Sequence, residues 1–196
     1  MKKQGLQTLL GLGIWLLSAA AMAHSGTDAA GGFMSGMLHP VTGLDHVTAM
    51  VAVGIVGAFM GQPAIWVLPV VFPLVMAFGG MLGVLGVPMP AIEPGIALSS
   101  IVLGTLIVLA VRPPLWIAAL IVAVFAIFHG YAHGAELPQS ANALAFSAGF
   151  VISTGILHLC GIGIGELIRW PTGKVVARAI GGLIALAGVG FLTGAL

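Results

Sequence analysis

The chain has 196 residues, of which 60% are hydrophobic and only 6% are charged; its length corresponds to one domain. Soluble domains carry about 25% charged residues, so this composition excludes a soluble enzyme and a disordered tail. A net charge of +1 offers no basic patch for nucleic acid, and the single cysteine excludes a disulfide framework. With a mean hydropathy of +1.19, the sequence indicates an integral membrane protein.

The first residues follow the pattern of a secretory signal. Met1-Lys2-Lys3 is basic, residues 9–21 are apolar, and Ala21-Met22-Ala23 is an A-x-A cleavage site. The apolar stretch is short for a membrane span, which needs about 20 residues. We predict a signal peptide over residues 1–23 and a transmembrane domain over residues 24–196, with an uncleaved first helix as the alternative.

Six apolar segments follow, separated by proline and polar residues that mark breaks. A helix satisfies its own backbone groups in lipid, so the sequence predicts an all-α integral membrane bundle of six transmembrane helices. The segments lie near residues 37–61, 64–87, 95–111, 114–134, 141–165 and 175–196.

The basic residues predict the orientation of the bundle. If the mature N-terminus lies outside, the loops after the first, third and fifth spans face the cytoplasm. Those loops or their flanks hold every basic residue of the mature chain, which the positive-inside rule requires: Arg112, Arg169, Lys174 and Arg178. We expect a multi-pass protein of the bacterial inner membrane with both mature termini in the periplasm.

Ionisable residues inside a membrane are costly and usually functional, and here they cluster on two spans. The first span carries His39, Asp45 and His46, and the end of the fourth carries His129, His133 and Glu136. The predicted topology places both groups in the external half of the membrane.

Helical geometry brings members of each group together. At about 100° per residue, the two histidines of the fourth span and Glu136 fall within roughly 60° of one face. His39, His46 and Met50 line one stripe if the first span is an unbroken helix. Two sets of imidazole and carboxylate at one depth can converge on one cation, and imidazole suits nickel, copper, zinc and iron.

Four other residues are weaker candidates for metal binding or for the transport pathway. Met50 lies below the cluster, and His158 on the fifth span either marks the onward path or hydrogen-bonds within the membrane, with Thr154 one turn away. Glu93 precedes a helix, where an acid also complements the helix dipole. His24 becomes the mature N-terminus if the signal is cleaved, so its amine and imidazole could chelate a metal; the alternative is a disordered tail residue.

Two runs of sequence resemble the HupE/UreJ family. The segment from His39 to His46, HPVTGLDH, is similar to the H-x5-D-H signature of these proteins, and the run from Phe128 to Glu136, FHGYAHGAE, is similar to their signature F-H-G-x-[AV]-H-G-x-E. Weaker likeness extends over residues 93–99 and over 149–161 of the fifth span. The resemblance covers the whole mature chain and the signal peptide.

This resemblance implies a secondary permease for nickel or cobalt that serves nickel enzymes such as hydrogenase or urease. It implies that the cargo is a divalent metal ion, that no cofactor is permanently bound, and that a cytoplasmic metallochaperone is a candidate recipient. It also carries over a metal-handling role to the six clustered residues. We expect Asp45, His46, His129 and His133 to form the first dehydrating site, with His39 and Glu136 at its mouth.

Two other functions stay open at this point. A membrane-embedded metalloenzyme, such as a zinc hydrolase, would want an H-E-x-x-H helix, but Gly130 follows His129. A haem subunit could use His46 and His133 as axial ligands, although Asp45 beside His46 argues against it. No G-x-x-x-x-G-K-[ST] run is present, so no nucleotide partner is expected.

Overall fold

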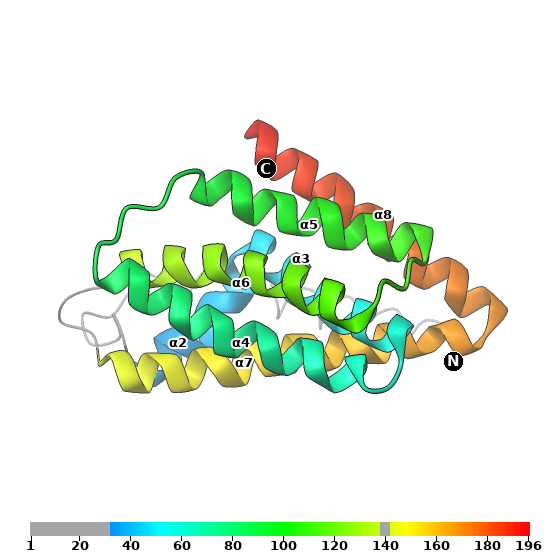
Figure 1. Cartoon of the computed structure of the whole chain (residues 1–196), viewed down its shortest axis with the longest axis horizontal. Helices are drawn as coiled ribbons and strands as arrows, with labels where there is room; N and C mark the ends of the chain where they lie inside the picture. The colour runs from blue at the N-terminus through cyan, green and yellow to red at the C-terminus, as the bar shows by residue number, and fades with distance from the viewer. Residues whose placement is uncertain (1–31, 138–141) are drawn as a thin grey trace, which may run out of the picture. The chain divides into compact units, whose positions relative to one another are not determined.

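The computed structural model describes residues 32–137 and 142–196, and every regular element in these two ranges is a helix (Figure 1). The elements are α2 (Phe33–Thr42), α3 (Leu44–Met60), α4 (Ala64–Val84), α5 (Ile92–Leu109), α6 (Leu115–Glu136), α7 (Ala143–Glu166), the 3-10 turn η1 (Leu167–Arg169) and α8 (Pro171–Thr193). The predicted all-α class is confirmed. The proposed signal peptide, residues 1–23, lies outside the described residues.

Five helices are each long and apolar enough to cross a membrane, namely α4, α5, α6, α7 with η1, and α8. A sixth span is reached only if α2 and α3 are counted together, because the two helices meet at an angle of 83°. The first apolar segment, placed near residues 37–61, is therefore two helices rather than one unbroken helix. The chain breaks at Gly43, whose φ of −94° and ψ of 115° are extended rather than helical.

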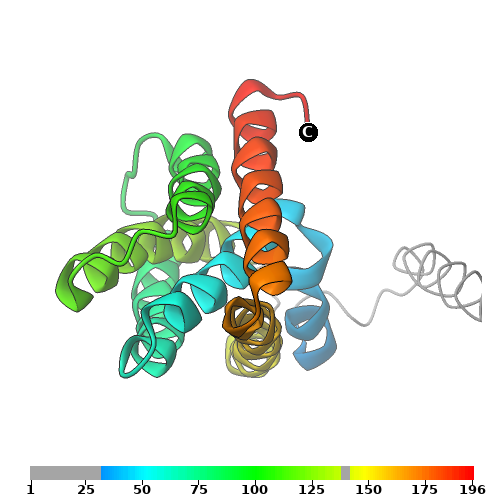
Figure 2. The ribbon, with the colours of Figure 1, turned by 90° about the vertical axis from the view of Figure 1, so that its right-hand side faces the viewer.

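Helix α3 lies at the centre of the bundle and packs against α2, α4, α5, α7 and α8 (Figure 2). From Ala52 to Phe59 every residue of α3 is buried. A helix that is apolar on all sides is expected to be enclosed by other helices. This central position explains why His46, near the start of α3, faces the interior of the protein.

The outer surface of the bundle is strongly apolar. Large side chains such as Trp66, Leu74 and Trp116 point outward with more than half of their surface exposed. Soluble monomers rarely expose contiguous apolar patches of more than a few hundred Å², whereas a protein surface that faces lipid can stay apolar. The fold is that of a multi-pass membrane protein.

Helices α4 and α6 approach so closely that only glycine fits at their contact. A Cβ atom on Gly130 would collide with the backbone oxygen of Met76, and one on Gly134 would collide with that of Gly80. Small residues at helix contacts allow such close approach in membranes. Because these glycines alternate with His129 and His133 along α6, the tight contact fixes the position of both histidines.

The basic residues gather at one end of the helices. Arg178, in α8, donates from Nε to the backbone oxygen of Val108 at 2.6 Å, which satisfies a carbonyl in the last turn of α5. Arg169 forms an ion pair with Glu166 at the end of α7. The end of α5 and the start of α8 are thus side by side, as the positive-inside argument requires; which side is cytoplasmic stays a prediction.

The α4–α6 contact can be tested with one added methyl group. We expect Gly130→Ala to lower the free energy of unfolding by about 1–3 kcal/mol, because overpacking forces the two backbones apart. The matched control is Gly163→Ala on α7, where a Cβ meets no atom within 4 Å. Thermal unfolding of the purified protein in detergent measures both, and equal midpoints for the two variants would contradict the close contact.

Candidate metal site

Four histidines from three helices converge near one end of the bundle. His133 of α6 lies in the middle of the group, with its ring centroid 4.7 Å from that of His39 on α2 and 4.3 Å from that of His46 on α3. The ring centroid of His46 also lies 4.7 Å from that of His129, which is one helical turn before His133 on α6. The two groups that the sequence assigned to different spans therefore meet in space.

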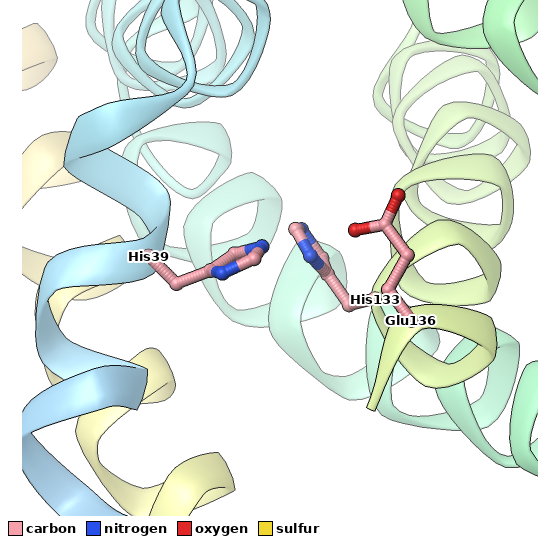
Figure 3. Close-up of side chains that lie close together, drawn as sticks. All are labelled: His39, His133 and Glu136. Carbon is pink, nitrogen blue, oxygen red and sulfur yellow. The ribbon is translucent and has the colours of Figure 1, made fainter. Parts of the chain in front are cut away.

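The break at Gly43 is what brings His39 into this group. In a straight helix His39 would share one stripe with His46 and Met50, as expected from the sequence. The 83° bend instead turns α2 so that the His39 ring points across to His133 (Figure 3). Met50, by contrast, is fully buried in the apolar core.

His39, His133 and Glu136 form the tightest set of metal-ligating atoms. One ligand atom from each lies within 4.8 Å of the others, and Figure 3 shows the His133 ring standing between His39 and the Glu136 carboxylate. Two donors on one ion at about 2.1 Å each can be no more than roughly 4.2 Å apart. The side chains therefore need only a small closing movement to hold one cation.

Several buried ring nitrogens in this site have no hydrogen-bond partner among the described residues. Within the described part of the chain, Nε2 of His46, Nδ1 of His129 and both ring nitrogens of His133 are buried without a hydrogen bond. An unsatisfied buried polar group costs about 1–3 kcal/mol. Several such atoms in one place are therefore unfavourable for the protein alone and well suited to a bound cation.

Asp45 fixes the orientation of the His46 ring. Oδ1 of Asp45 lies 2.8 Å from Nδ1 of His46 and also accepts from the His46 backbone N–H at 2.8 Å. An ionised carboxylate only accepts hydrogen bonds, so Nδ1 carries the hydrogen and Nε2 keeps its lone pair for an ion. A Cβ on Gly43 would lie 2.8 Å from this same Oδ1, so a larger residue at the break would displace the Asp45 carboxylate.

Ser99 orients His129 in the same way, a role that was not predicted from the sequence. Its hydroxyl donates to the backbone oxygen of Ile96 at 2.6 Å and lies 2.9 Å from Nε2 of His129. Since serine has one proton to donate, Nε2 must donate to Ser99. The lone pair of His129 is then on Nδ1, the atom that is buried without a partner among the described residues.

The surroundings of the site favour a cation. A partly open cavity of about 270 Å³ leads to it, and its lining includes three carboxylates, those of Asp45, Glu93 and Glu136. His39 and His133 each lie in the last turn of their helix, where the helix dipole presents partial negative charge. Glu93 therefore belongs to the approach to the site, although no metal-binding atom of Glu93 falls within the tight set of His39, His133 and Glu136.

Two of the weaker candidates fall elsewhere. His158 is buried on α7, away from the four clustered rings, and contacts the ring of Phe72 at 5.6 Å. The ring centroid of Phe72 also lies 5.7 Å from that of His129, a contact that the sequence did not indicate. His24 lies outside the described residues.

Fold and site together define a multi-pass helical membrane protein with a buried, histidine-rich cluster beside an acidic cavity. Residues 12–191 match the family model described as HupE / UreJ protein. The chain is 46% identical over 178 residues to Protein HupE of Rhizobium leguminosarum bv. viciae, an alignment that covers 91% of this chain and 93% of the relative. No solved structure shows significant similarity.

The chain belongs to the HupE/UreJ family, as the resemblance of its two signatures predicts. This is a family of nickel and cobalt transporters, and the apolar helices of the chain agree with a transmembrane transporter.

The Ser99 hydrogen bond predicts a change in metal affinity. We expect Ser99→Ala to weaken Ni²⁺ binding by about 10-fold or more, since partners that orient metal-binding histidines typically contribute 10–100-fold. Isothermal titration of the purified protein measures the affinity. The control is Ser100→Ala, because Ser100 is equally buried but pairs with Thr48.

Ser99→Thr keeps a hydroxyl at this position and should restore the affinity. Equal loss in Ser99→Ala and Ser100→Ala, with no recovery in Ser99→Thr, would mean that packing rather than the hydrogen bond to His129 is responsible.

Proposed function

We propose that this protein is a secondary permease that carries Ni²⁺ or Co²⁺ from the periplasm to the cytoplasm and serves nickel enzymes such as hydrogenase or urease. The observation that carries the proposal is the convergence of four imidazoles beside an acidic cavity. Three of them have buried ring nitrogens without a hydrogen-bond partner among the described residues, and the chain belongs to a nickel and cobalt transporter family. The proposed residues are His39, Asp45, His46, His129, His133 and Glu136.

The acidic cavity is the proposed entrance. Asp45, Glu93 and Glu136 line it, and a cleft lined by one sign of charge concentrates the counter-ion. A hydrated dication would first meet the mouth of the site at His39, His133 and Glu136, whose ligand atoms already lie within 4.8 Å of one another. It would then pass inward to the fixed lone pairs of His46 and His129.

The site holds its cargo without being a closed cage. The ligand atoms of His39, His133 and Glu136 lie within 4.8 Å of one another, and the cavity beside them is partly open, so an ion held there keeps a way out. Conduction requires binding that is favourable enough for the ion to enter and weak enough for it to leave. A preformed high-affinity cage would retain the metal.

The driving force needs no nucleotide. Moving one elementary charge through 100 mV contributes about 2.3 kcal/mol, so a dication is drawn towards a negative cytoplasm without a coupled ion. In this proposal the His39 side of the bundle faces the periplasm, and the end that carries Arg169 and Arg178 faces the cytoplasm. A metallochaperone is the proposed recipient there.

Uptake of labelled Ni²⁺ tests the function. Cells that make the protein should accumulate nickel, and His133→Ala and Asp45→Asn should each lower the uptake by at least about 10-fold, because one removes the central ligand and the other releases the His46 tautomer. Thr193→Ala, at the exposed end of α8, is the control at matched membrane levels. Excess Co²⁺ should compete, whereas Mg²⁺ should not, because Mg²⁺ prefers oxygen ligands.

A wild-type protein that inserts correctly but moves neither nickel nor cobalt would contradict the permease. The membrane-embedded metalloenzyme would then be the function to test.

A further inference from the structure

A second polar group lies deeper in the bundle, on α7. His158 is 1% exposed and Thr154 is fully buried. Within the residues that the structure describes, neither ring nitrogen of His158 nor the hydroxyl oxygen of Thr154 has a hydrogen-bond partner. Polar atoms left unsatisfied in an apolar interior are unfavourable, so packing alone does not account for this pair.

The backbone oxygen of Pro69 on α4 has no helical partner at the usual position, because the residue four positions later, Pro73, has no N–H to donate. His158 and Pro69 both line a cavity of about 320 Å³ between α4 and α7. Thr154 lies one helical turn before His158 on α7. An imidazole and a freed carbonyl thus share one cavity, with a buried hydroxyl one turn away.

Neighbouring cavities lie between this region and the four-histidine site. His133 lines both the acidic cavity and a second cavity of about 260 Å³ between α4, α6 and α7. Val151 lines the second cavity and also the one that contains His158. The ring of Phe72 contacts His129 on one side and His158 on another.

His158 lies farther from the proposed entrance than the outer histidines do. His133 is in the last turn of α6, and a short connection leads from there to the start of α7 at Ala143. His158 is about 15 residues into α7, which at 1.5 Å per residue corresponds to roughly 22 Å from that end. An ion that leaves the outer site towards the basic end of the bundle passes this depth.

We propose that His158, the Thr154 hydroxyl and the Pro69 carbonyl form a second, inner binding site for the transported divalent cation. The inference rests on the permease function proposed above. The donors are one nitrogen and two oxygens, a set that borderline cations such as Ni²⁺ and Co²⁺ accept. No Asp or Glu among the described residues lines this cavity, so the inner site binds more weakly and passes the ion on.

The test compares binding with transport in the full-length protein. Equilibrium dialysis with ⁶³Ni²⁺ gives the number and affinity of sites, and uptake into proteoliposomes gives KM and Vmax. We expect His158→Ala to bind one Ni²⁺ fewer at saturation, to keep the affinity of the outer site, and to lose about 10-fold in Vmax with little change in KM. His133→Ala, in contrast, should lose the outer site.

A variant on α4 tests the carbonyl and leaves His158 in place. Pro73→Ala supplies an N–H that binds the Pro69 oxygen, so Vmax should fall by a few-fold. Leu74→Ala, at the neighbouring exposed position, is the control: it supplies no new N–H and leaves the Pro69 carbonyl free, so Vmax should stay near the wild-type value. If His158→Ala fails to fold, this pair of variants decides the question.

Wild-type stoichiometry and Vmax in His158→Ala would overturn the inner site, and so would equal Vmax values in Pro73→Ala and Leu74→Ala. If His133→Ala is inactive in that same experiment, the permease function stands and only the inner site falls. If the wild-type protein neither binds nor moves nickel, both proposals fall together.

Discussion

Unpaired imidazole nitrogens in a water-poor interior are the constraint around which this protein is built. The rings of His46, His129 and His133 are buried, and each presents at least one ring nitrogen without a hydrogen bond among the described residues. Such an arrangement persists only if the rest of the fold stabilises it. The glycine contacts between α4 and α6 supply part of that stability through close backbone packing. The hydrogen bonds from His46 to Asp45 and from His129 to Ser99 fix which ring nitrogen stays free.

The break at Gly43 also contributes to the histidine cluster. Non-helical backbone at membrane depth is tolerated where it lines a cavity, and Gly43 lines the acidic cavity. The bend converts a helix that could present histidines along one stripe into two helices that approach the cluster from different directions. It also exposes the end of α2 near His39, so a partial negative charge is added where a cation would lie. Broken helices at substrate sites serve similar purposes in other transporters.

Much of the site could be predicted from the sequence because charged and imidazole groups stand out in apolar segments. His129, His133 and Glu136 share a face since α6 is regular, and helical periodicity is enough to find them. The contact of His39 with His133 could not be predicted, because it depends on the angle of the break. Ser99 was missed for a different reason: a buried serine commonly bonds its own helix, and its second bond to His129 depends on the packing of α5 against α6.

The distribution of fixed charge gives the proposed pathway its direction. Carboxylates line the cavity at the outer site, whereas among the described residues the cavities towards His158 have none in their lining. A dication is thus attracted by acids at the entrance and met by neutral donors further in, where its binding is weaker. Weak inner binding is unfavourable for storage but favourable for transport, because an ion that has lost its water needs a ligand at each step and must leave each one. With the membrane potential acting on both charges, the inward step from the acidic site to His158 needs no further source of energy, and the neutral inner donors keep release from becoming the slow step.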